Sequence, residues 1–203
     1  MDSALLTLVA TLTAYWLGVG IMIVRVRRHA RRIVGVVPEQ RLERLMGLAW
    51  IPIVTAWIAL PWLAAARPQS GFAVPAWATT LEWPTVLRLA ASIVAVLSLA
   101  ATVKCWVRMG KDWRMAVTGE PAQPLITDGL FARIRHPIYA FSILLMLCTM
   151  MILPTVPMLV VGCAHITLMV MKARNEEQHL LAHHGEVYAK YLKRTGRFMP
   201  LIR

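Results

Sequence analysis

The sequence predicts an all-α integral membrane protein with five transmembrane helices. Of its 203 residues, 58% are hydrophobic and only 16% are charged, whereas a soluble domain carries about a quarter charged residues. The basic residues, which give a formal net charge of +12, fall in blocks between long apolar runs. That distribution is typical of a protein facing an anionic membrane surface, and it argues against a nucleic-acid partner. The length favours a single domain, residues 1–203.

Two runs without any charged residue, 3–24 and 45–66, are each long enough for a helix to cross the bilayer. At about 1.5 Å per residue each would reach roughly 33 Å, against a hydrocarbon core of about 30 Å. A third run, 89–103, is shorter. We expect the flanking Arg88 and Lys104 to extend to the two membrane surfaces, which would let this run cross as well.

The last apolar run, residues 136–171, contains no Asp, Glu, Lys or Arg. One helix of that length would be about 54 Å long, which is too much for a single crossing. The segment LPTVP, residues 153–157, interrupts the run with two prolines, which stop a helix. We therefore expect a tight hairpin of two short helices, about 138–153 and 156–172, which brings the total to five.

The loops between these runs differ strongly in charge. Loop 25–44 has seven arginines, loop 67–86 has one, segment 108–135 has five basic residues, and the tail 172–203 has seven. Because basic loops of a multi-pass protein stay in the cytoplasm, we expect the N-terminus outside and the C-terminus inside. An interfacial aromatic belt is expected near the neutral outer loop, formed by Trp57, Trp62, Phe72, Trp77 and Trp83.

The stretch ARIRHPIYA, residues 132–140, places strong positive charge at the start of an expected membrane helix. Pro137 suits the first position of that helix, because its missing N–H would have no partner there, and His136 is then near the N-cap. Free N–H groups and the positive end of the helix dipole attract an anion, and Arg133 and Arg135 add formal charge. The stretch is therefore either a site for a carboxylate or phosphate, or an anchor that contacts lipid headgroups.

A pair of carboxylates lies at the other end of the expected hairpin. Glu176 and Glu177 stand side by side where the last helix leaves the membrane, and carboxylates close to lipid are costly unless they are paired or used. Gly185 predicts the end of that helix. Because a hairpin returns its two ends to one membrane face, the cationic helix start and the carboxylate pair should meet. Together they suit a zwitterionic ligand.

Two longer stretches carry a resemblance to a known family. ITDGLFARIRHPIYA, residues 126–140, is followed about forty residues later by EEQHLLAHHGEVYAKYLKRTGRFMPLI, residues 176–202, and is preceded by MGKDWRMAV, residues 109–117. In this order, across an apolar hairpin, they resemble the isoprenylcysteine carboxyl methyltransferase family, which is similar to the phospholipid N-methyltransferases. The resemblance covers about residues 105–203, and the first two spans add only topology.

The resemblance implies a membrane methyltransferase that uses S-adenosylmethionine, releases S-adenosylhomocysteine and methylates a lipophilic acceptor, either a prenylcysteine-like carboxylate or a lipid amine. It implies a cofactor-binding and catalytic region at 105–203, after three transmembrane helices in 1–104, with a cytoplasmic C-terminal helical cap over the cofactor. The implied cofactor-binding residues are Gly129, Leu130, Arg135, His136, Pro137, Tyr139, Glu176, Glu177 and Tyr188. The implied catalytic residues are Arg174, Glu177 and Arg197, of which Arg174 would hold a reacting carboxylate.

Other interpretations compete with this one. His165 lies in the middle of the last span, where it either hydrogen-bonds a neighbouring helix or belongs to the site. Glu176-x-x-His179 resembles half of a di-metal site, but only one copy exists, so no metal is expected. The C-terminal pattern is also similar to NADPH-dependent sterol reductases, although the short chain and the paired glutamates favour methyl transfer. A non-enzymatic membrane scaffold would leave those glutamates unexplained.

Overall fold

The computed structural model describes residues 2–30, 41–110, 113 and 125–201. Within these ranges the regular elements are all helical, which confirms the all-α prediction. They are α1 (Ser3–Ala30), α2 (Arg41–Ala66), α3 (Trp77–Thr80), α4 (Glu82–Met109), the 3₁₀ turn η2 (Gly129–Ala132), α5 (Pro137–Ile152) and α6 (Val156–Arg194). Much of the first basic loop and most of the MGKDWRMAV segment lie outside the described residues.

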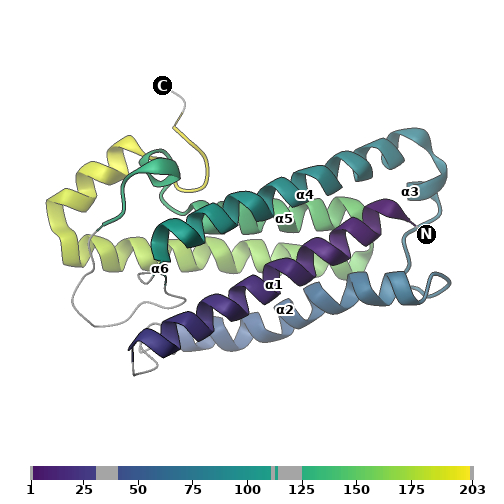
Figure 1. Cartoon of the computed structure of the whole chain (residues 1–203), viewed down its shortest axis with the longest axis horizontal. Helices are drawn as coiled ribbons and strands as arrows, with labels where there is room; N and C mark the ends of the chain where they lie inside the picture. The colour runs from purple at the N-terminus through teal and green to yellow at the C-terminus, as the bar shows by residue number, and fades with distance from the viewer. Residues whose placement is uncertain (1, 31–40, 111–112, 114–124, 202–203) are drawn as a thin grey trace.

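The helices α1, α2, α4, α5 and the first part of α6 run lengthwise in one elongated bundle (Figure 1). In this bundle α4 packs along α5, α1 contacts α2, α4 and α5, and α6 contacts α2 and α5. Four helices, α1, α2, α4 and α6, are long and apolar enough to cross a membrane, so the protein is a multi-pass membrane protein. Because α5 has only 16 residues, the count of five spans stays a prediction.

The proline break lies where LPTVP predicts it, since α5 ends at Ile152 and α6 begins at Val156. Helix α6 then continues past residue 172, as expected of a helix that leaves the membrane there. Its 39 residues would measure about 58 Å, so only its apolar first part fits within the hydrocarbon core. At Gly185 the backbone leaves helical geometry with φ of 50°, which confirms the break expected there, although the helix resumes afterwards to Arg194.

Arg88 is buried, and the expectation that it reaches the membrane surface was wrong. Its side chain is only 4% exposed, its Nε donates to the Ile152 carbonyl oxygen at 2.8 Å, and its Nη2 pairs with the Asp2 carboxylate. The last carbonyl groups of a helix have no partner inside that helix, so the end of α5 offers a buried acceptor. Arg88 thereby joins the start of α1, the first turns of α4 and the end of α5.

Trp57 also departs from the expected position at the interface. It has no exposed surface, and its indole Nε1 donates to Thr149 Oγ1 of α5 at 3.0 Å. An indole placed between helices satisfies its single donor there and leaves its apolar rings in the core. The other aromatic residues of the expected belt are exposed: Trp62, Phe72, Trp77 and Trp83.

The predicted orientation can be tested with reporters fused to the chain. A reporter that is active only in the cytoplasm should be active after the C-terminus and silent when inserted into loop 67–86, because the basic segments alternate with the neutral one. A C-terminal reporter that works only outside the membrane would contradict this topology.

Candidate active site

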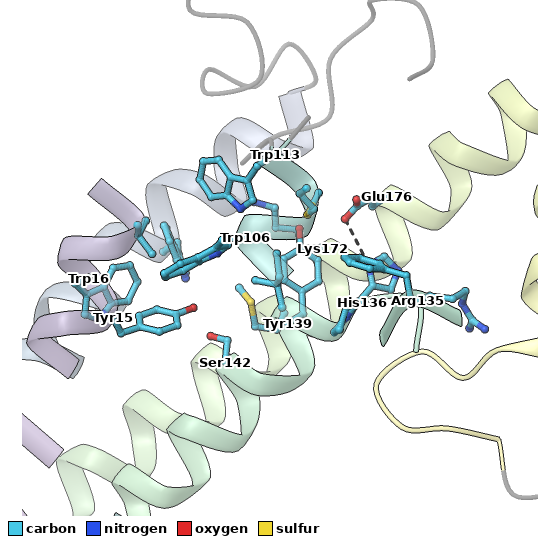
Figure 2. A pocket seen from close by; sticks show the side chains of 17 residues that line it. Tyr15, Trp16, Trp106, Trp113, Arg135, His136, Tyr139, Ser142, Lys172 and Glu176 are labelled. Carbon is cyan, nitrogen blue, oxygen red and sulfur yellow. Dashed lines mark ion pairs between the residues drawn. The ribbon is translucent and has the colours of Figure 1, made fainter. Parts of the chain in front are cut away.

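The start of α5 and the charged part of α6 meet at one end of the bundle, as the hairpin predicts. Arg135 Nε donates to Glu177 Oε1 at 2.9 Å, and His136 Nδ1 lies 3.6 Å from Glu176 Oε2, an ion pair drawn in Figure 2. His136 is the N-cap of α5 and Pro137 is its first residue, which confirms the expected helix start. The two charged segments are therefore next to each other in space although about forty residues separate them.

Glu177 lies between two guanidinium groups. Arg197 Nη2 donates to Oε2 at 2.6 Å, opposite the contact from Arg135. Burial alone would raise the pKa of the Glu177 carboxyl, but contacts with His136, Arg197 and Arg135 outweigh it and hold that pKa below its usual range. The same hydrogen bond raises the pKa of Arg197. Glu177 is thus ionised, and its charge is balanced within the protein.

The segment after α6 holds the start of α5 through its backbone, a contact that the sequence did not predict. Arg135 N donates to the Gly196 carbonyl oxygen at 2.9 Å, and His136 N donates to the Arg197 carbonyl oxygen at 3.1 Å. In return, Gly196 N donates to the Arg133 carbonyl oxygen at 3.0 Å. Residues of both predicted motifs are therefore fixed relative to each other by main-chain as well as side-chain bonds.

A pocket containing about 770 Å³ of empty space, part of it open to the surroundings, lies beside these contacts (Figure 2). Its charged and imidazole side chains are Arg135, His136, Lys172 and Glu176. Its aromatic wall consists of Tyr15, Trp16, Trp50, Trp106, Trp113, Phe131 and Tyr139. A pocket that is mostly apolar, with a few convergent polar groups, is typical of small-molecule sites.

The first half of the chain supplies much of the aromatic wall. Tyr15 and Trp16 come from α1, Trp50 from α2 and Trp106 from α4. We expected the first two spans, which correspond to α1 and α2, to add only topology, because a helix that is apolar all round gives no sign of which face points inward. Trp113, which belongs to the MGKDWRMAV stretch of the resemblance, was not among the predicted site residues and is buried at the pocket.

Three buried polar atoms at the pocket have no hydrogen-bond partner among the described residues. They are the indole Nε1 atoms of Trp16 and Trp50 and the Nε2 atom of His136. His136 Nε2 lies 3.4 Å from Glu177 Oε1 without forming a hydrogen bond. Indole can only donate, and a buried donor without a partner costs about 1–3 kcal/mol. These atoms therefore suit a ligand that carries hydrogen-bonding oxygen or nitrogen atoms.

Arg174 is a predicted site residue whose side chain faces away from the pocket. It is exposed on α6, two residues from Glu176, which turns its side chain roughly 200° around the helix. Lys172 is four residues before Glu176 and shares its face, so it is the cation that α6 contributes to the pocket. A role for Arg174 at the reacting group stays a prediction that this placement does not favour.

Five further predicted residues do not line the pocket: Gly129, Leu130, Glu177, Tyr188 and Arg197. Gly129 and Leu130 are exposed in η2, where Gly129 has φ of 57°, while the neighbouring Phe131 lines the pocket. Phe131 is held from behind, because its carbonyl oxygen accepts the hydroxyl of Tyr191 at 2.5 Å. Tyr188, one helical turn before Tyr191 in α6, is also buried. Their contact with a cofactor stays a prediction.

Comparison with known proteins gives one family. The model of the isoprenylcysteine carboxyl methyltransferase family matches residues 90–183. The match covers slightly less than half of the chain. The matched region includes the RHP stretch, the α5–α6 hairpin and the glutamate pair, and it stops short of Tyr188 and Arg197. No curated protein matches the chain. That family is one of methyltransferases, and the matched residues include the charged and imidazole groups of the pocket: Arg135, His136, Lys172 and Glu176.

Proposed function

We propose that this protein transfers a methyl group from S-adenosylmethionine to a lipophilic acceptor in the membrane. The observation that carries the proposal is the pocket where the cationic start of α5, the Glu176 carboxylate and an aromatic wall converge. The match of residues 90–183 to a methyltransferase family supports the reaction class. S-adenosylhomocysteine would leave as the product.

The charged groups of the pocket match the two ends of the cofactor's amino-acid part. We assign its carboxylate to the helix start at Pro137 with His136, and its ammonium to Glu176. Because two arginines already bind Glu177, its role is to hold Arg135 at the rim of the pocket. The aromatic wall suits the flat adenine ring, because aromatic rings stack on one another. It also suits the positively charged sulfonium, because the faces of aromatic rings attract cations.

The cofactor supplies a methyl group that its sulfonium already activates, so the protein's task is positioning. The pocket residues have to align the acceptor with that methyl group and keep water away. A carboxylate acceptor reacts in its ionised form, and Lys172 is placed to hold it. An amine acceptor must first lose a proton, and Glu176 is placed to accept one. Arg197 supports this arrangement through Glu177.

Methyl transfer is tested directly with the purified protein, S-adenosylmethionine labelled in its methyl group and a membrane lipid extract. The expected result is a labelled product in the lipid phase, whose identification names the acceptor. Glu176→Gln should reduce the transfer roughly tenfold or more at low cofactor concentration, whereas the matched variant Arg174→Ala should not. Oxidation of NADPH without labelled product would indicate a reductase, and neither reaction would indicate a scaffold.

A further inference from the structure

His165 is a histidine in the middle of a membrane helix with an incomplete set of partners. It has no exposed surface, and its Nε2 lies 3.1 Å from Ser142 Oγ of α5. This contact confirms the expected hydrogen bond to a neighbouring helix. Its other ring nitrogen, Nδ1, has no hydrogen-bond partner among the described residues. A polar side chain in the middle of a membrane helix is energetically costly, so we expect His165 to do more than fill space in the core.

The imidazole ring is held in one orientation. Its centroid lies 4.6 Å from the ring of Trp57, which is itself fixed by the hydrogen bond from its Nε1 to Thr149. Trp57 and His165 are both fully buried, so neither ring has room to turn toward solvent. His165 Nε2 is therefore directed at Ser142.

Ser142 connects this buried pair to the pocket. His136, Tyr139 and Ser142 stand on successive turns of α5 and all line the pocket, with Ser142 about 9 Å deeper along the helix than His136. In Figure 2 the hydroxyl groups of Tyr15 and Ser142 point toward one another. A chain of polar groups thus runs from His165 through Ser142 to Tyr15, at the end of the pocket farthest from the charged residues.

The unpartnered Nδ1 sets the direction of the hydrogen bonds in this chain. A buried N–H without a partner is rarer than a buried acceptor without one, so the proton belongs on Nε2. With the proton on Nε2, His165 donates to Ser142. The Ser142 proton is then available to the facing oxygen of Tyr15, which leaves the Tyr15 proton for the pocket. The deep end of the pocket therefore presents a hydrogen-bond donor.

We propose that the Tyr15 hydroxyl donates to an oxygen atom in the head group of the methyl acceptor, and that Ser142 and His165 are the positioning residues that direct this proton toward it. This inference rests on the proposed methyl transfer, because it assigns His136 and Glu176 to the cofactor, and Lys172 with the deep end of the pocket to the acceptor. It makes these three residues determinants of acceptor specificity. An acceptor with an oxygen-bearing head would be preferred over one with an amine or with no polar head.

The test uses binding, so that it does not depend on turnover. Three photoreactive probes share one C15 isoprenoid chain and carry a carboxylate, a primary amine or only hydrogen at the head. Labelling of the protein in lipid nanodiscs is measured in the presence of S-adenosylhomocysteine and normalised to the probe in the membrane. The variants are Tyr15→Phe, Ser142→Ala, Ser142→Thr, His165→Leu and His165→Gln. The control Ser98→Ala removes a buried serine of α4 that donates to its own helix and does not line the pocket.

The unmodified protein should favour the carboxylate probe, and Tyr15→Phe, Ser142→Ala and His165→Leu should each reduce that preference about threefold to tenfold. Ser142→Thr and His165→Gln keep a hydrogen-bonding group and should retain part of it, and Ser98→Ala should retain all of it. Affinity for S-adenosylhomocysteine should stay within about twofold throughout, which shows that the variants are folded.

Several results would overturn the assignment. Equal labelling by all three probes, a preference for the amine probe, or an unchanged preference in Ser142→Ala and Tyr15→Phe would each do so. A change in melting temperature alone, with the preference intact in the His165 variants, would reduce His165 to a packing residue. Loss of labelled methyl transfer with the probe preference intact would instead contradict the proposed reaction and leave the head-group site in place.

Discussion

Replacing Glu177 with glutamine should weaken the binding of S-adenosylhomocysteine by roughly ten- to 150-fold. Both Arg135 and Arg197 bind the Glu177 carboxylate. The backbone of Arg135 is also hydrogen-bonded to Gly196, so a shift of Arg135 would move the rim of the pocket. Losing one charge-assisted hydrogen bond costs about 1.5–3 kcal/mol, which corresponds to that range in affinity. Arg135→Ala removes the same contact from its other side and should have an effect of similar size.

The double variant separates a shared role from two independent ones. If Glu177 and Arg135 orient the same ligand, their combined effect should be clearly smaller than the sum of the single effects, measured by calorimetry on all three proteins. Arg174→Ala is the matched control, because Arg174 lies on the exposed face of the same helix. Unchanged affinity in both single variants would mean that the charged helix start serves as an anchor at the membrane surface.

Arg88→Met should lower the stability of the whole bundle without changing the cofactor site. Arg88 is buried and bonds to Ile152 and Asp2 at the end of the bundle away from the pocket, so its loss leaves a carboxylate and a carbonyl group unpaired. We expect the free energy of unfolding to fall by about 2–4 kcal/mol. This is a little less than for a fully buried ion pair, because Asp2 is partly exposed. For a chain of this size that corresponds to roughly 5–15 °C in melting temperature.

The matched control for Arg88 is Arg67→Ala. Arg67 follows α2 at the same end of the bundle, but it is exposed. A substitution there should therefore change the free energy of unfolding by less than about 0.5 kcal/mol. Asp2→Asn should fall between the two, because Asp2 also accepts hydrogen bonds from the Ala4 and Leu5 backbone at the start of α1. A melting temperature of Arg88→Met equal to that of Arg67→Ala would contradict the assigned role.

Local signals in the sequence were sufficient for the breaks and caps of the fold. Pro137 at the first position of α5, the LPTVP break between α5 and α6, and the kink at Gly185 all occur where side-chain chemistry predicts them. The meeting of the RHP stretch with the glutamate pair followed from connectivity alone, since a short hairpin has to return its ends to one side.

The sequence did not predict how the helices pack against one another. A membrane helix is apolar on every face, so its sequence does not show that Trp57 points inward or that Arg88 finds partners across the bundle. For the same reason the aromatic wall from α1, α2 and α4 was not predicted. Arg174 shows the opposite limit, because a charged residue near the right motif still faces away when the helix turns it outward.

The most direct test of the central claim is the effect of ligands on the melting temperature of the purified protein. S-adenosylhomocysteine should raise it, because a ligand that binds only the folded state stabilises that state, and NADPH at the same concentration should not. Glu176→Gln should reduce the rise, and Arg174→Ala should preserve it. A rise with NADPH and none with S-adenosylhomocysteine, or no rise with either, would contradict the claim that this pocket holds the cofactor of a methyl transfer.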